Sequence, residues 1–81
     1  MFKKVITNFG GTIILDTSAL VCSKFNLKPG DKVVFAEGTE RERRGVFEGV
    51  TQDYLIWITF ENCFWSNCIG APSRWKNLKV L

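Results

Sequence analysis

Residues 54–60 (YLIWITF) constrain the fold of this chain more than any other stretch. Successive side chains of a β-strand point to opposite faces. Alternation therefore places Leu55, Trp57 and Thr59 on one face. The opposite face carries Tyr54, Ile56, Ile58 and Phe60. Because both faces are apolar, we expect either a central strand or a strand with one face covered by the N-terminal segment or by a partner chain, with Trp57 in the core.

The length and composition favour one small folded domain. The chain has 81 residues, close to the lower limit for a single hydrophobic core, and 46% of them are hydrophobic, which argues against disorder. No apolar run approaches the roughly 20 residues that a membrane helix needs, and the first residues show no signal-peptide pattern. We therefore expect a cytoplasmic protein without membrane contact, in which residues 1–81 form a single domain.

Several short segments have the composition of β-strands and are separated by turn residues. Besides residues 54–60, these segments are residues 3–7, 12–15, 32–36, 45–50 and 77–81. Gly45 and Gly49 suggest bulges or sharp bends within one of them. Residues 69–74 (IGAPSR) are expected to be irregular. The close spacing of these strands predicts a mainly β fold, a small barrel or a sandwich.

One short helix is expected between the second and third strands. Asp16, Thr17 and Ser18 are all good helix N-cap residues. The apolar side chains that follow them fall roughly on one face of a helix near residues 17–26. Pro29 then prevents the helix from continuing. The helix is expected to lead, across the turn at Pro29 and Gly30, into the strand at residues 32–36.

Residues 28–81 resemble an SH3-like barrel. A strand opens with GDKVVF, a long charged loop follows, and RGVFEGV precedes a tight turn and the strand YLIWITF. This order is similar to that of the KOW, Tudor and Sm-like small barrels. The resemblance implies a small SH3-like barrel of about five to seven short antiparallel strands. It implies a binding module and leaves the ligand open, because one barrel fold serves many functions.

Residues 5–35 carry a second resemblance. They contain, in this order, a strand, a glycine, an apolar pair of β residues, a short helix and the stretch LKPGDKVVF. This order is similar to that of the AbrB-type swapped-hairpin domain. That resemblance implies an intertwined dimer that binds DNA through basic residues near its first strands. The alternative is a plain strand-initiating turn, because proline presets φ and glycine supplies the positive φ that follows it.

The chain offers little material for catalysis. It contains no histidine, the commonest general base and metal ligand. Cys22, Cys63 and Cys68 do not have zinc-site spacing, and none has a visible base partner. We expect them to be reduced and partly buried, with a Cys63–Cys68 disulfide only in an oxidising environment. We therefore expect no enzyme activity, no catalytic residues, no bound metal and no cofactor.

Binding is the function class that the sequence favours. Guanidinium groups suit phosphates and planar rings suit stacked bases. The candidate binding residues are Arg41, Arg43, Arg44, Trp65, Arg74 and Trp75. Two alternatives stay open for them. Glu40 and Glu42 interleave with the arginines, so the loop can instead be held by its own ion pairs, and the tryptophans can instead cap an open end of the barrel.

The net charge of +3 permits nucleic-acid binding without requiring it. Our first hypothesis is a small barrel that binds RNA or DNA. The second is a protein-interaction or assembly module, including a dimer, that uses exposed aromatic residues. An AbrB-like DNA-binding dimer is a minor alternative. Basic residues near both termini would form a further positive patch if the first and last strands pair: Lys3, Lys4, Arg74, Lys76 and Lys79.

Overall fold

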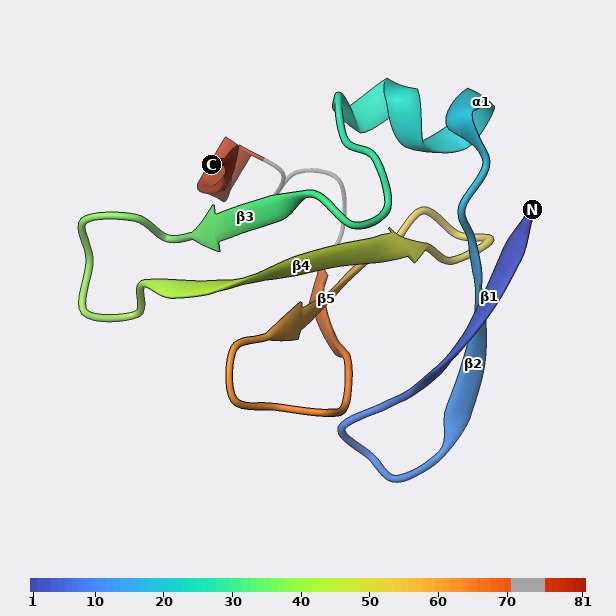
Figure 1. The fold of residues 1–81 in the computed structure, drawn as a ribbon, viewed down its shortest axis with the longest axis horizontal. Coiled ribbons are helices and arrows are strands. Elements are labelled where there is room, and N and C mark those ends of the chain that lie inside the picture. Colours follow the sequence, from blue (N-terminus) through green and yellow to red (C-terminus); the bar gives the residue numbers. More distant parts are fainter. Residues whose placement is uncertain (71–75) are drawn as a thin grey trace.

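The structure of the protein, a computed structural model, describes residues 1–70 and 76–81. Seven strands and one short helical segment make up this part of the chain (Figure 1). In chain order the elements are β1 (Phe2–Ile6), β2 (Thr12–Asp16), α1 (Ala19–Cys22), the 3₁₀ turn η1 (Ser23–Phe25), β3 (Lys32–Phe35), β4 (Arg43–Val50), β5 (Ile56–Phe60), β6 (Asn67–Gly70) and β7 (Leu78–Val80). No helix in the described residues is long and apolar enough to cross a membrane.

The strands pair in antiparallel fashion around β4. Residues 43–46 of β4 pair with β3, and residues 45–50 pair with β5. β2 adds one pair, between Asp16 and Val50 at the C-terminal end of β4. β1 extends β2, β7 extends β3 and β6 extends β5. β4 is therefore the strand that joins the parts of the described sheet.

The prediction of a mainly antiparallel β fold with one short helix near residues 17–26 is confirmed. The described strands do not close into a barrel. Instead, an isolated parallel bridge between Thr7 and Ser66 brings the end of β1 to the residue that precedes β6. The resemblances to SH3-like barrels and to the AbrB-type domain stay predictions.

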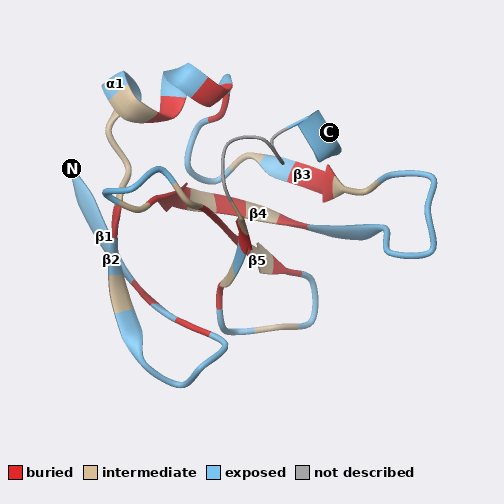
Figure 2. Cartoon of the chain, turned by 180° about the vertical axis from the view of Figure 1, so that it is seen from behind, coloured by how far each residue is buried: buried red, intermediate tan, exposed pale blue. Residues whose placement is uncertain are grey.

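The main hydrophobic core lies between the sheet and the α1–η1 segment. Its buried members are Cys22, Phe25, Leu27, Val33, Phe47, Val50, Ile56, Ile58, Phe60 and Ile69. Figure 2 shows that β5 and β4 are mostly buried or half-buried, with the exposed residues of β4 at its start. Burying one large apolar side chain contributes roughly 1.5–3 kcal/mol, so this cluster supplies most of the hydrophobic stabilisation.

The helical segment begins at an N-cap of the predicted kind. Ser18 Oγ accepts a hydrogen bond from the Val21 N–H (3.4 Å), and the Asp16 carboxylate accepts one from the Ser18 N–H (2.8 Å). These bonds satisfy donors near the start of the helix and in the chain leading to it. η1 ends at Phe25 and is capped by Asn26, which has a left-handed φ of 55°. The chain therefore turns back toward the sheet at this residue.

Residues 28–31 form the turn that precedes β3. The Asp31 carboxylate accepts a hydrogen bond from the Lys28 N–H (2.8 Å). Gly30 has a φ of 95° and donates its N–H to the Phe47 carbonyl (2.8 Å), while the Phe47 N–H donates to the Asp31 carbonyl (2.9 Å). The turn is thereby fixed to β4 and continues the ladder between β3 and β4.

A second, smaller core covers the Trp57 face of β5. Val5 of β1, Leu15 of β2 and Trp57 are buried together, with Ile13 and Leu55 packed against them. Trp57 is only 6% exposed. The expectation that the N-terminal segment covers one face of this strand is therefore confirmed. The β4–β5 ladder separates this small core from the main one.

The strand boundaries differ from the sequence prediction by one or two residues, and the largest differences in assignment concern β5 and β6. Tyr54, predicted as the first residue of a strand, has a φ of 64° and belongs to the preceding turn, so β5 begins at Ile56. Thr51 holds that turn, because its hydroxyl accepts the Leu55 N–H (3.0 Å). Ile69, predicted to be irregular, lies in β6, which is specified by pairing with β5 rather than by a pattern of its own. The rest of that prediction, residues 71–74, lies outside the described residues.

Gly45 and Gly49 are required for different reasons. The register between β4 and β5 shifts immediately before Gly49, so the predicted bulge is present. Gly49 has a φ of 148°, and a Cβ there would lie 2.9 Å from the Asp16 carbonyl oxygen. A Cβ at Gly45 would overlap the Thr59 carbonyl oxygen. Gly45 therefore permits the close approach of β5 instead of forming a bend.

Replacing Gly45 by alanine is expected to destabilise the protein by about 2 kcal/mol, because the added methyl group has to displace the β5 backbone. Gly11→Ala is the matched control, since a Cβ at Gly11 meets nothing within 4 Å. Urea unfolding followed by circular dichroism measures both variants. Equal unfolding midpoints would contradict the close approach of β5 at Gly45.

Candidate functional site

The three predicted arginines, Arg41, Arg43 and Arg44, lie where β4 begins. Arg43 places its guanidinium carbon 3.9 Å from the ring centroid of Phe60. Its Nη2 also donates to Cys63 Sγ at 3.8 Å. A cation above an aromatic face is attracted by the ring quadrupole. Arg43 is therefore held in place while it stays exposed to solvent.

Arg44 points to the opposite face of β4 from Arg43, because successive strand residues alternate. Its backbone carbonyl accepts a hydrogen bond from the Glu61 N–H (2.8 Å). Val34 of β3 lies opposite Arg44 on one side and opposite Lys79 of β7 on the other. Because cross-strand partners share a face, Arg44 and Lys79 flank Val34 on the same face of the sheet.

The acidic residues of the β3–β4 loop do not pair with these arginines. The Glu42 carboxylate accepts the Gly38 N–H (2.9 Å), and Glu37 forms an ion pair with a lysine of β7 (3.4 Å). Within residues 1–70 and 76–81, no ion pair joins a carboxylate to any of the three arginines. The alternative of a loop held by arginine–glutamate pairs is therefore not observed. All three guanidinium groups belong to exposed residues.

Trp65 lies in the loop between β5 and β6 and is partly exposed, at 36%. Its ring meets the ring of Phe64 edge-on, with centroids 4.9 Å apart and planes at 78°. Phe64 is 82% exposed. The same loop contacts the arginines through Glu61 and Cys63, as described above. The exposed aromatic pair and the arginines therefore lie on adjoining segments.

The structure places Arg43 and Arg44 at the start of β4, Arg41 in the β3–β4 connection and Trp65 in the β5–β6 connection. Both connections leave the same end of the β4–β5 ladder (Figure 1). The remaining candidates, Arg74 and Trp75, lie outside the described residues. The first and last strands do not pair, because β1 pairs with β2 and β7 pairs with β3. The basic residues of β1 and β7 therefore do not form the single patch considered from the sequence.

Sequence reasoning misses three aromatic residues of this region. Phe60 lies beneath the guanidinium group, although its pattern assigns it to the core alone. Phe64 and Phe9 are 82% and 85% exposed. Phe9 lies at the tip of the β1–β2 hairpin and follows Asn8, whose N–H donates to the Ser66 carbonyl (3.0 Å). The sequence feature that could have predicted the exposure of Phe9 is its position between an asparagine and two glycines, because the ring of a residue in a tight turn is not buried.

A chain of polar side chains ties the N-terminal hairpin to the sheet. Lys3 forms an ion pair with Glu48 (2.7 Å), Glu48 accepts a hydrogen bond from the Thr59 hydroxyl, and the Thr59 and Ser66 hydroxyls lie 2.8 Å apart. Ser66 is 2% exposed. The Trp57 Nε1 atom is also buried and finds no hydrogen-bond partner in the described residues. These contacts hold the hairpin against the sheet. None of the groups forms a nucleophile–base pair, so they do not indicate a catalytic site.

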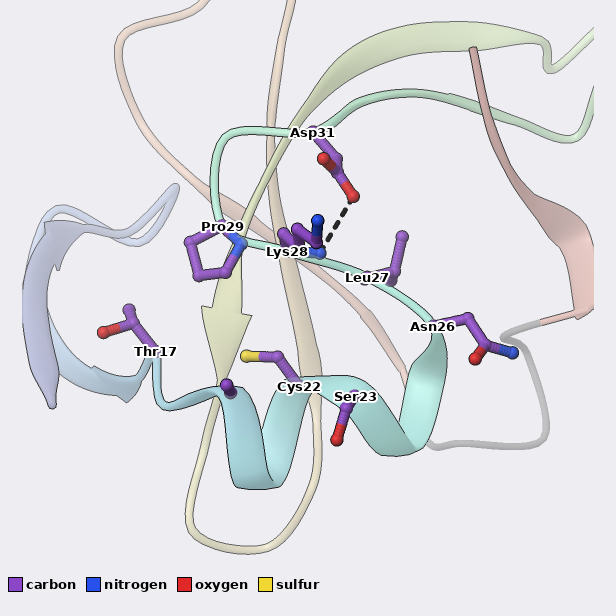
Figure 3. Close-up of a pocket in the computed structure, with 9 residues that line it drawn as sticks. Thr17, Cys22, Ser23, Asn26, Leu27, Lys28, Pro29 and Asp31 are labelled. Atoms are coloured by element: carbon purple, nitrogen blue, oxygen red, sulfur yellow. Dashed lines mark hydrogen bonds between the residues drawn. The ribbon is translucent and has the colours of Figure 1, made fainter.

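A pocket of about 530 Å³ lies beside the α1–η1 segment (Figure 3). It is lined by Thr17, Ala19, Cys22, Ser23, Asn26, Leu27, Lys28, Pro29 and Asp31. The Asp31 carboxylate already accepts a backbone hydrogen bond. Burial raises the pKa of the Cys22 thiol, so it stays neutral and is a poor nucleophile. In the described residues, no group of three or more His, Cys, Asp or Glu side chains could hold a metal ion.

No protein-family model matches this chain, and no curated protein or solved structure matches it significantly. Its function is therefore inferred from the placement of the arginines and the exposed aromatic rings, and from the chemistry that those groups support.

The three thiols are expected to differ in reactivity. Cys68 is exposed and Cys63 is half-buried, whereas Cys22 is 1% exposed and has a raised pKa. Because the thiolate is the reacting species, iodoacetamide at about pH 8 should label Cys68 and Cys63 in the folded protein, and Cys22 only after unfolding. Peptide mass spectrometry reads each site. Equal labelling rates for Cys22 and Cys68 under native conditions would contradict the burial of Cys22.

Proposed function

We propose that this protein is a non-enzymatic module that binds single-stranded nucleic acid. The observation that carries the proposal is the position of Arg43, whose guanidinium group lies over the Phe60 ring and contacts the loop that bears Phe64 and Trp65. Proteins that bind single strands combine cationic side chains along the backbone with aromatic side chains under the bases. A cytoplasmic location is part of the same proposal.

The arginines suit the phosphates of such a strand. None of Arg41, Arg43 and Arg44 forms an ion pair within the described residues. Apart from the Arg43 donor that is bonded to Cys63 Sγ, their guanidinium donors are therefore open to an incoming anion. A guanidinium group presents a planar fork of donors that matches phosphate oxygens. Arg43 is also partly ordered before binding by its contact with Phe60, which lowers the entropy lost when a phosphate is bound.

The exposed rings suit bases that are not paired. Phe64 is largely exposed, and Trp65 presents part of its ring from the same loop. Base–aromatic stacking contributes about 1–3 kcal/mol per base and requires unstacked bases. The described part of the chain has no helix of the length that usually reads a major groove. These features support single strands over duplexes.

A protein-interaction or assembly module is the second candidate function. The observation in its favour is the outer face of the β1–β2 hairpin, where Phe2, Ile6 and Ile14 are 74%, 51% and 54% exposed. The hairpin register places these three side chains on one face. Exposed apolar patches of this kind mark interaction sites on small soluble domains.

Binding is tested with a fluorescently labelled oligothymidine strand and a duplex of equal length, across a range of salt concentrations. We expect the single strand to bind more tightly, with log affinity falling linearly with log salt. Arg43→Gln should lower the slope by about 0.7, the value for one phosphate contact on a single strand. Arg44→Gln should lower it less, because Arg44 lies on the opposite face of β4. Lys28→Gln is the control, because Lys28 lies beside the pocket near α1.

Two results would contradict this proposal. The first is the absence of binding at low salt, where phosphate contacts are strongest. The second is an equal loss of affinity in Lys28→Gln and Arg43→Gln, which would mean that net charge alone attracts the strand. Trp65→Ala distinguishes stacking from charge, since it should lower affinity by about 1–3 kcal/mol without changing the salt slope.

A further inference from the structure

The outward edge of β1 carries backbone groups that have no partner in the described residues. The Thr17 N–H donates to the Met1 carbonyl (2.9 Å) and the Thr7 N–H donates to the Gly11 carbonyl (2.8 Å). In an antiparallel ladder every second residue bonds to the partner strand, so residues 1, 3, 5 and 7 bond to β2. The N–H and C=O groups of Phe2 and Lys4 therefore point away from β2.

The chain itself shows that this edge accepts an extended segment. The Ile6 carbonyl, which also points outward, accepts the Ser66 N–H (2.7 Å), and the Ser66 carbonyl accepts the Asn8 N–H (3.0 Å). These two bonds form the parallel bridge between Thr7 and Ser66. They fill the C-terminal end of the edge only. Among the residues that the structure describes, none pairs with the outward backbone groups of Phe2 and Lys4, which leaves about four residues, or roughly 13 Å, of this edge open.

The side chains beside this open edge favour an apolar and acidic partner. Phe2 and Ile6 flank the edge on the outer face of the hairpin, with Ile14 behind them. Lys4 lies between them and forms no ion pair in the described residues, whereas Lys3 is paired with Glu48. β1 carries no acidic residue. An added strand would therefore cover the apolar side chains and bring an acidic residue to Lys4.

We propose that the open edge of β1 binds an extended, acidic segment of a partner protein by β-strand addition. Main-chain hydrogen bonds to Phe2 and Lys4 hold the segment, its apolar side chains cover Phe2 and Ile6, and a carboxylate pairs with Lys4. The proposal deepens the second candidate function and is independent of nucleic-acid binding at the arginines.

A second copy of the chain fits this edge less well. If two β1 strands paired in antiparallel fashion, Lys3 and Lys4 of one copy would lie opposite or next to the same lysines of the other. Like charges directly opposite across a ladder are destabilising, and lysines on an edge strand discourage self-pairing. A partner strand with acidic residues removes that repulsion.

The test titrates the ¹⁵N-labelled protein with a capped peptide of alternating glutamate and valine, about seven residues long, the length of an ordinary strand. We expect the largest amide shifts at Phe2 and Lys4. Lys4→Pro removes an outward N–H but none of the bonds to β2, and should weaken binding roughly tenfold or more. Lys4→Gln keeps that N–H and loses only the charge, so binding should weaken about threefold.

A matched peptide of alternating lysine and valine is the control and should bind at least tenfold more weakly than the acidic peptide, a difference of about 1.4 kcal/mol. If Lys4→Pro fails to fold by circular dichroism, N-methylation of the amides of the acidic peptide replaces it and should abolish the shifts. Nucleic-acid binding by the Lys4 variants should equal that of the unaltered protein, which separates this proposal from the first one.

Three results would overturn the proposal. The first is the absence of shifts at Phe2 and Lys4 with millimolar acidic peptide. The second is equal binding of the acidic and basic peptides, which would remove the role of Lys4. The third is a concentration-dependent dimer in sedimentation that Lys4→Pro abolishes, because the edge would then belong to a second copy of the chain.

Discussion

The antiparallel ladder between β4 and β5 is the constraint on which the rest of the structure depends. It separates the main core, which contains Phe47 and Ile58, from the small core around Trp57. Gly45 lets the backbones of β4 and β5 approach closely, and the absence of a side chain at Gly49 leaves room for the end of β2. The hairpin, the helical segment and the loops that carry the candidate site are all positioned by these two strands.

The same ladder explains why Arg43 has an aromatic ring beneath it. Gly45 lies directly opposite Phe60, and Arg43 is two residues before Gly45 on the same strand. Residues two apart in a strand share a face. Because glycine has no side chain to cover the ring, the long side chain of Arg43 reaches across and occupies its face. A residue required for close packing therefore also shapes the surface that we propose for nucleic-acid binding.

The sequence predicted correctly those features that the residues of one segment determine by themselves. The two apolar faces of residues 54–60 predicted that Trp57 would be covered, and the polar residues before Ala19 predicted the helix N-cap. It did not predict the features that depend on pairing between segments far apart in the chain. β6 has no apolar alternation and exists because β5 offers it hydrogen bonds. Likewise, the exposed arginines were predicted by residue type, but the contact between Arg43 and Phe60 depends on register, which no local pattern encodes.

The small core has a consequence for how the protein is made. Val5 and Leu15 belong to a hairpin of neighbouring residues, and local pairing of this kind forms within microseconds. Trp57, which covers them, is separated from Leu15 in the chain by the helical segment, β3 and β4. During synthesis, at about 5–20 residues per second, the growing chain therefore spends a period of seconds with these apolar side chains uncovered. A nascent chain interrupted before Trp57 would keep that surface exposed and be a natural target for chaperones.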